Sequence, residues 1–275
     1  MPEIPTSNPE LTGLEGIHLW HAGLSTCSQR VRITLAELKQ SYESHIVNLH
    51  AGENASEWYQ AIHPGGVVPA LVHDGRLFIE SVDIIDYLDQ ELGSRRFSPV
   101  ERVEMDIMHA LMARADQAQK HLKLLTFEFL FRAAPPMDNA VVKTYQNTHN
   151  SEWLKSFHRD FHAGFERSRI EQSVAETDKD FKVLDKRLGD GRTFLSGSDF
   201  GLADIAWIPN FHRFDLIGWP YERYPNLQRW FKRISSRESY DFALQSWEPR
   251  ELLDIVAPRL AARQASGDGI ESYFI

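Results

Sequence analysis

The segment Ser25–Glu37, STCSQRVRITLAE, decides the fold class of this 275-residue chain. Apolar side chains recur at helical spacing within it and just after it, at Val31, Leu35 and Leu38. The apolar run IHLW at 17–20 precedes the segment, and small polar residues lie between the two. This order predicts a strand, a loop and then a helix.

The sequence after this helix continues to alternate between strands and helices. The predicted elements are a strand at 42–49, a helix at 55–62 that ends at His63–Gly66, a hairpin formed by VVPALV and RLFIE at 67–80, and a helix that Ser81 caps. The order βαβ followed by ββα is the thioredoxin-like arrangement. We expect this α/β domain over residues 17–94, after a loose leader at 1–16.

Strand signals disappear after Pro99. Helix-forming residues with helical apolar spacing fill 101–132, 150–188 and 202–216, so an all-α C-terminal domain is predicted over 99–260. Ala133–Asn150, with two prolines and several asparagines, is expected to be an irregular connection. Residues 261–275 are expected to trail off as a tail.

Composition restricts the class of protein. A hydrophobic content of 42% and a charged content of 25% are typical of a globular protein. No apolar stretch reaches the length of a membrane span, and the N-terminus lacks the pattern of a secretory signal. One cysteine, Cys27, suits a reducing compartment, so a cytoplasmic protein is expected. A net charge of −9 argues against a nucleic-acid partner and favours a protein that acts on small molecules.

Ser25 and Cys27 are candidates for sulfur chemistry. They lie where the first strand meets the first helix, and unpaired backbone N–H groups and the helix dipole favour an anion there. Ser25 would donate a hydrogen bond to the sulfur of a bound thiol, or Cys27 would itself be a reactive thiol. The ordinary alternative is that Ser25 only caps the helix and Cys27 is a small buried hydrophobe.

Two further segments have the character of a peptide-binding site. Pro69 lies at the start of a predicted strand, where a cis bond to Val68 would explain it and would leave the Val68 backbone free for an extended ligand. Glu80 and Ser81, at the next helix start, suit the amino and carboxyl groups of an amino acid. A trans proline at an edge strand and a simple helix cap are the alternatives.

Residues 17–92 resemble the N-terminal domain of glutathione transferases, and the segment STCSQRVRITLAE is similar to the active-site segment of the zeta class. It is also similar to that of the related tetrachlorohydroquinone reductive dehalogenases. The segments FLSGSDFGLADIAW and YPNLQRWFKRISSR are similar to the C-terminal domain of the same group. VPAL and ESVDIIDYL are the most specific elements of the resemblance.

The resemblance implies glutathione as cosubstrate, no metal, and a homodimer that acts in detoxification or in aromatic compound catabolism. Ser25 would hold the glutathione thiolate and Cys27 would form or resolve a mixed disulfide. Binding of the tripeptide falls to Ser25, Asn54, Val68, Pro69, Glu80 and Ser81, and the second-substrate pocket to His121 and Phe127. Gly201 stands where the family has Ser or Thr before the internal helix, which leaves Asp204 with a one-sided, structural capping role.

Several reactions fit this site. Glutathione could displace halide, cleave an aryl ether, isomerise by reversible addition or act as a reductant. A non-catalytic glutathione-binding or regulatory protein of the same fold is the second hypothesis, because a fold does not guarantee activity. A thiol oxidoreductase that depends on Cys27 alone is the third.

Overall fold

The computed structural model describes residues 3–274, which form two compact units. The first unit contains the described residues up to Leu92 and also Pro136–Gly164. The second contains Gly93–Pro135 and the residues from Phe165 onward. The chain therefore passes from the first unit to the second, returns for two helices, and passes to the second again.

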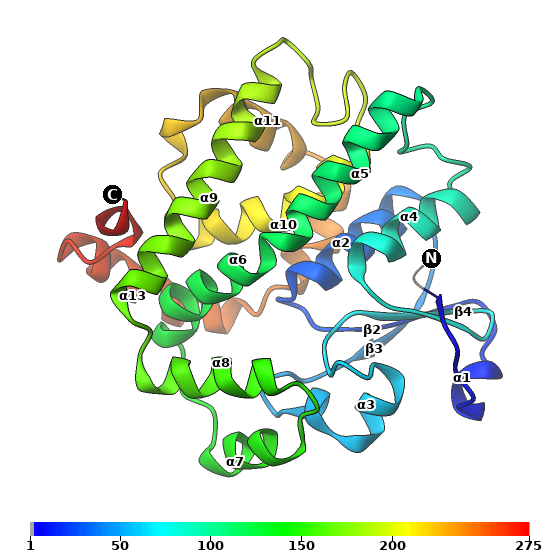
Figure 1. The fold of residues 1–275 in the computed structure, drawn as a ribbon, viewed down its shortest axis with the longest axis horizontal. Coiled ribbons are helices and arrows are strands. Elements are labelled where there is room, and N and C mark those ends of the chain that lie inside the picture. Colours follow the sequence, from blue (N-terminus) through cyan, green and yellow to red (C-terminus); the bar gives the residue numbers. More distant parts are fainter. Residues whose placement is uncertain (1–2, 275) are drawn as a thin grey trace. The chain divides into compact units, whose positions relative to one another are not determined.

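A five-stranded sheet is the centre of the first unit (Figure 1). Its strands lie in the order β1-β5-β4-β2-β3 and have these bounds: β1 (Glu3–Ile4), β2 (Ile17–His21), β3 (Glu43–Ile46), β4 (Ala70–His73) and β5 (Arg76–Phe78). Strands β2 and β3 are parallel, whereas β4 is antiparallel to both β2 and β5. The predicted βαβ and ββα order is thus confirmed.

Helices cover both faces of this sheet (Figure 1). Helices α2 (Thr26–Glu37) and α4 (Ser81–Glu91) pack against each other on one face, and α3 (Glu57–Ile62) covers the other. Successive strand residues point to opposite faces. Trp20, Ala70 and Val72 accordingly join Tyr59 and Ile62 of α3 in one buried cluster. This packing of one sheet face on α3 holds the strands in place, and the candidate site residues lie beyond the ends of these strands.

Residues 3–12 differ from the expected loose leader. Strand β1 pairs with β5, with Glu3 opposite Phe78, and Leu11 of the short helix α1 (Pro9–Thr12) is buried in the cluster under the sheet. Asn8 caps α1 by accepting from the Glu10 N–H group at 3.0 Å. A strand of two residues gives no periodicity to read, which is why sequence reasoning missed it.

The second unit is all-helical, as predicted. Its helices are α5 (Arg102–Gln117), α6 (Gln119–Leu125), α9 (Arg167–Leu188), α10 (Leu202–Leu216), α11 (Pro225–Ile234), α12 (Glu238–Ala243) and α13 (Arg250–Ala265). Helix α10 is buried from Leu202 to Phe214, and Phe181 of α9 packs among the aromatic rings around it. Within residues 3–274, no helix has the length and apolarity needed to cross a membrane.

Asp204 has the structural role expected of it. Its carboxylate accepts from the Gly201 N–H group at 3.0 Å, the Leu195 N–H group at 2.8 Å and the Trp230 indole N–H group at 2.7 Å. Burial raises the pKa of Asp204 to about 6, against the opposing effect of these donors. Because Gly201 has no side chain, the capping box has only the half that Asp204 supplies.

Two stretches expected to be irregular are ordered. Within Ala133–Asn150, helix α7 (Asn139–Thr148) begins at the Asp138 cap, and α8 (Glu152–Ala163) follows it. Both helices belong to the first unit. In the expected tail, α13 continues to Ala265, and a 3₁₀ turn at Ile270–Tyr273 buries the side chains of both its end residues. Long-range packing orders these stretches, and sequence patterns do not record it.

Replacing Leu11 with Ala tests whether the leader is part of the fold. We expect this change to lower the free energy of unfolding by about 2 kcal/mol, because Leu11 is only 2% exposed. Denaturant unfolding followed by circular dichroism measures the difference. Glu10→Ala, an exposed neighbour on the same short helix, is the control and should change stability by less than about 0.5 kcal/mol. Equal stability of the Leu11 variant and the wild type would restore the loose-leader interpretation.

Candidate functional site

Ser25 is the N-cap of α2. Its backbone is extended, at φ −69° and ψ 117°, and its Oγ accepts from the Ser28 N–H group at 3.2 Å. Among the residues that the structure describes, the Ser25 hydroxyl donates to no acceptor. Capping by acceptance leaves this proton available to a ligand at a helix end that favours negative charge.

The loop between β2 and Ser25 is held by buried side chains of α2. Arg32 donates to the carbonyl oxygens of Ala22 at 3.1 Å and of Gly23 at 2.8 Å, and the Ala22 N–H group donates to Ser28 Oγ at 3.3 Å. Arg32 is 1% exposed. Sequence reasoning missed this residue, although a basic residue amid the apolar positions of RVRITLAE is a signal that could have identified it.

His21 completes this support in its neutral form. Arg32 donates to His21 Nδ1 at 3.0 Å, so the ring proton lies on Nε2, which donates to Ser44 Oγ at 2.8 Å. Burial, with the charge of Arg32 beside it, lowers the pKa of His21 to about 3. The uncharged imidazole therefore links the parallel strands β2 and β3 through its hydrogen bond to Ser44.

The bond between Val68 and Pro69 is cis, as the sequence suggested. Trp20 pairs with Ala70 in the β2–β4 ladder, so continuing the register places Val68 level with Ala22, three residues before Ser25. In the described part of the chain, the Val68 N–H and C=O groups have no hydrogen-bond partner. The structure thus brings a backbone with unpaired N–H and C=O groups next to the end of β2, where α2 begins.

Helix α4 begins one residue earlier than predicted, because its N-cap is Glu80 and not Ser81. Glu80, at φ +65° and exposed, occupies the N-cap position without a side-chain capping bond, and Ser81 is the first helical residue. Ser81 is buried, and its Oγ accepts from Arg30 of α2 at 3.1 Å. This bond ties the beginning of α4 to the first turns of α2. The N-terminal ends of two helices therefore lie near each other at the candidate site.

Asn54 and Cys27 are placed differently from each other. Asn54 is buried and its side-chain amide donates to the Gly66 carbonyl oxygen at 2.8 Å, so this donor serves the fold instead of facing solvent. Cys27 is half-buried in the first turn of α2, two residues after Ser25. Within residues 3–274, no three His, Cys, Asp or Glu side chains converge as they would around a metal ion.

His121 and Phe127, the predicted second-substrate residues, lie in the second unit. His121 Nδ1 is 3.2 Å from Ser173 Oγ of α9, and burial lowers the pKa of this imidazole. Phe127 lies in the π-helical turn Thr126–Leu130 and packs edge-to-face on Phe131, with 5.0 Å between ring centroids. Their contact with a second substrate stays a prediction.

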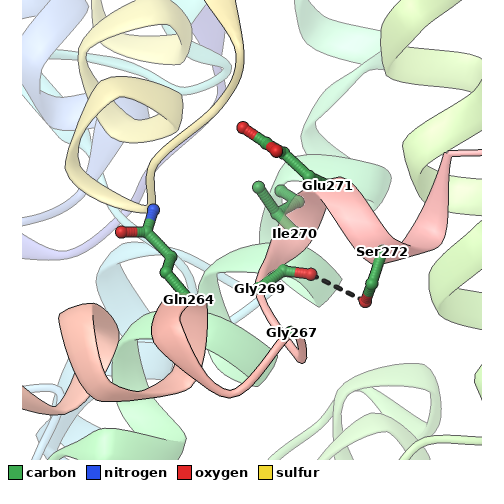
Figure 2. Close-up of a pocket in the computed structure, with 6 residues that line it drawn as sticks. All are labelled: Gln264, Gly267, Gly269, Ile270, Glu271 and Ser272. Atoms are coloured by element: carbon green, nitrogen blue, oxygen red, sulfur yellow. Dashed lines mark hydrogen bonds between the residues drawn. The ribbon is translucent and has the colours of Figure 1, made fainter.

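Two hollows of the second unit lie near its C-terminal segment, and neither lining includes His121 or Phe127. One, of about 530 Å³, is lined by Gln264 and residues of the 267–272 stretch, where Ser272 Oγ donates to the Gly269 carbonyl oxygen at 2.9 Å (Figure 2). The other, of about 410 Å³, is bordered by Glu128, Phe129 and three arginines. Glu128 pairs with two of those arginines, and Asp268 pairs with one of the same two.

The neutral His21 gives the chain a measurable pH dependence. An unfolded histidine takes up a proton near pH 6.5, whereas folded His21 stays neutral down to a pH of about 3, so stability is lost as the pH falls below 6.5. Between pH 7 and pH 4.5 we expect the wild type to lose about 2 kcal/mol more than His21→Asn, whose oxygen can accept from Arg32 but does not titrate. Urea unfolding at both pH values measures this; parallel losses would contradict the assignment.

Comparisons with known proteins agree with this arrangement. Residues 19–96 match the family model described as "Glutathione S-transferase, N-terminal domain", and residues 167–233 match "Glutathione S-transferase, C-terminal domain". Glutathione S-transferase GstB of Escherichia coli K12 is 29% identical over 226 residues, which cover 80% of this chain and 94% of that protein. Glutathione S-transferase hmp2 of Hypomyces subiculosus is 27% identical, with 82% and 95% covered.

A solved structure shares the fold at lower identity. The β-etherase LigF from Sphingobium sp. strain SYK-6 superposes with a TM-score of 0.75 at 20% identity, covering 84% of this chain and 99% of that one. The maleylacetoacetate isomerase of Dictyostelium discoideum is 25% identical, with 82% of this chain and 91% of that protein covered. The two matched family models account for the sheet with α2 and α4 and for the helices around α10. The chain therefore belongs to the glutathione S-transferase superfamily.

Proposed function

We propose that this protein is a glutathione transferase whose first unit binds glutathione and presents its sulfur as a thiolate to a small aromatic electrophile. The observation that carries the proposal is the state of Ser25. Its oxygen caps α2 by accepting from Ser28, so its hydroxyl proton remains available for a sulfur placed at the helix end. A helix N-terminus and a hydroxyl donor both stabilise an anion there.

The groups around Ser25 suit the rest of the tripeptide. An extended backbone can form two hydrogen bonds with the Val68 N–H and C=O groups, in the main-chain pairing that peptides use when they bind alongside a strand. The first N–H groups of α4, with Ser81, suit the carboxylate of the γ-glutamyl end, and exposed Glu80 suits its ammonium group. The Asn54 amide nitrogen donates to the Gly66 carbonyl oxygen, which supports this loop, and the role of Asn54 toward glutathione stays a prediction.

The required activation is modest. A free thiol has a pKa near 8.5, so a few per cent of it is thiolate at neutral pH, and each unit of lowering is worth about 1.4 kcal/mol. A hydrogen bond from Ser25 together with the N-terminus of α2 lowers the pKa of the thiol by about one to two units. The thiolate then forms a carbon–sulfur bond to the electrophile as the leaving group departs with its electron pair.

The class of electrophile is proposed from chemistry and from the relatives. The relatives' names include a β-etherase and a maleylacetoacetate isomerase. For this chain, the step that we propose is attack of the glutathione thiolate on an electron-poor carbon. We propose displacement at a small aromatic substrate, by loss of halide or, from an aryl ether, of the aryloxide, with His121 and Phe127 as candidate contacts. Turnover of an aryl halide, measured with retention on immobilised glutathione, separates an enzyme from a non-catalytic binder.

Ser25→Ala tests the role of the hydroxyl. We expect at least about a tenfold loss of kcat/KM for glutathione conjugation, because a transition-state hydrogen bond to sulfur is removed. Initial rates with 1-chloro-2,4-dinitrobenzene measure the effect.

Two further variants separate Ser25 from Cys27. Ser25→Thr retains a capping hydroxyl and should recover most of the activity, and Cys27→Ser should conjugate at close to the wild-type rate. Loss of activity in Cys27→Ser with full activity in Ser25→Ala would reverse the assignment and favour thiol exchange through Cys27.

A further inference from the structure

Helices α7 and α8 are fastened to the loop that leads to the cis proline. Gln60 of α3 donates to the Thr148 carbonyl oxygen at 2.9 Å, and its own side-chain oxygen accepts from the Asn150 N–H group at 2.6 Å. The Asn150 side chain donates to the Pro64 carbonyl oxygen at 3.3 Å. These bonds hold the link between α7 and α8 against the first unit.

His149 lies at the centre of this attachment. It is 1% exposed, and its Nδ1 accepts from the Ser151 N–H group at 3.0 Å. The neutral ring therefore has its proton on Nε2, which donates to the Gly66 carbonyl oxygen at 3.1 Å. Both ring nitrogens thus have defined partners, and one of them is the backbone three residues before Pro69.

The contact between His149 and Gly66 leaves no spare room. Gly66 has φ +58°, and a Cβ built on it would lie 2.6 Å from His149 Nε2 and 2.9 Å from the Asn54 carbonyl oxygen. The imidazole lies where the side chain of any other residue would begin. The Gly66 carbonyl oxygen also accepts from the Asn54 amide, so two buried donors fix its direction.

Fixing Gly66 fixes the backbone that follows. The next carbonyl oxygen, of Val67, accepts from the buried Tyr59 hydroxyl at 2.7 Å. Two consecutive carbonyl groups are thereby held by side chains, and Val68 is the next residue, whose N–H and C=O groups remain unpaired within the described chain. The orientation of Val68 follows from bonds made two residues earlier.

We propose that His149 is a positioning residue for the glutathione site. It acts from a segment that interrupts the helical unit, and it holds the Gly66 carbonyl group so that Val68 faces the tripeptide backbone. The inference rests on the proposed function, because glutathione is the ligand that Val68 would bind. A preorganised loop does not have to be ordered at the moment of binding, so losing the bond should weaken affinity about fivefold, the effect of one neutral hydrogen bond.

Two substitutions at His149 separate this bond from simple packing. His149→Asn retains an oxygen that can accept from the Ser151 N–H group, but its side chain is too short to reach Gly66. His149→Gln can place an amide N–H group near the position of Nε2 and should retain the bond. We expect His149→Asn to raise the Kd for glutathione, measured by calorimetry, about fivefold, and His149→Gln to stay within about twofold of the wild type.

Hydrogen exchange gives a second readout that does not depend on the ligand. The Gly66 N–H group donates to the His63 carbonyl oxygen at 2.8 Å, so its exchange reports the order of this loop. In the free protein, exchange at Gly66 should be faster in His149→Asn than in His149→Gln or the wild type. Gln146→Ala, which removes the bonds from α7 to the Lys155 carbonyl oxygen and to the Arg159 side chain of α8, is the control and should alter neither readout.

The outcomes are distinct. Absence of glutathione binding by the wild type would refute the proposed function, and His149 would then have no glutathione site to position. Binding by the wild type with unchanged Kd in His149→Asn would refute the positioning role alone. Weaker binding without faster exchange at Gly66, or an equal effect of Gln146→Ala, would likewise overturn it, because the effect would then not pass through this loop.

Discussion

The site depends on how the backbone groups beyond the ends of β2 and β4 find hydrogen-bond partners. Such groups leave the ladder of the sheet, and burying them unpaired costs about 1–3 kcal/mol each. Arg32 takes the carbonyl groups of Ala22 and Gly23, and Tyr59 takes that of Val67. In the described chain, Val68 is left with unpaired backbone groups beside the end of β2, where α2 begins. A peptide ligand can use them because the neighbouring groups are already paired.

The same arrangement concentrates the features that favour an anion. The N-terminal regions of α2 and α4 are linked by the hydrogen bond from Arg30 to Ser81. Ser25 accepts a hydrogen bond as the N-cap of α2 and still has its hydroxyl proton to donate. None of these features is large alone, since a helix end is worth about 0.3–1 kcal/mol at an exposed position. Together they match the one or two pKa units by which a thiol has to be lowered to act as a nucleophile at neutral pH.

Local sequence patterns predicted what local forces determine. The order of strands and helices, the cis bond at Pro69 and the helical second unit follow from spacing and from residue chemistry, and the half capping box of Asp204 follows from the family resemblance. The structure confirms all four. Strand β1 and the packing of α7 were not predictable, because a two-residue strand and contacts across 80 or more residues leave no local pattern. His149 was missed for the same reason, since its partner Gly66 lies 83 residues earlier.

Amide-resolved hydrogen exchange of Val68, with and without glutathione, tests the central claim most directly. The Val68 N–H group is unpaired within the described chain, so it should exchange quickly in the free protein and become protected when the tripeptide pairs with it. Protection should saturate with glutathione concentration. Saturating binding of glutathione that leaves Val68 unprotected would contradict the account, because the ligand would then lie elsewhere.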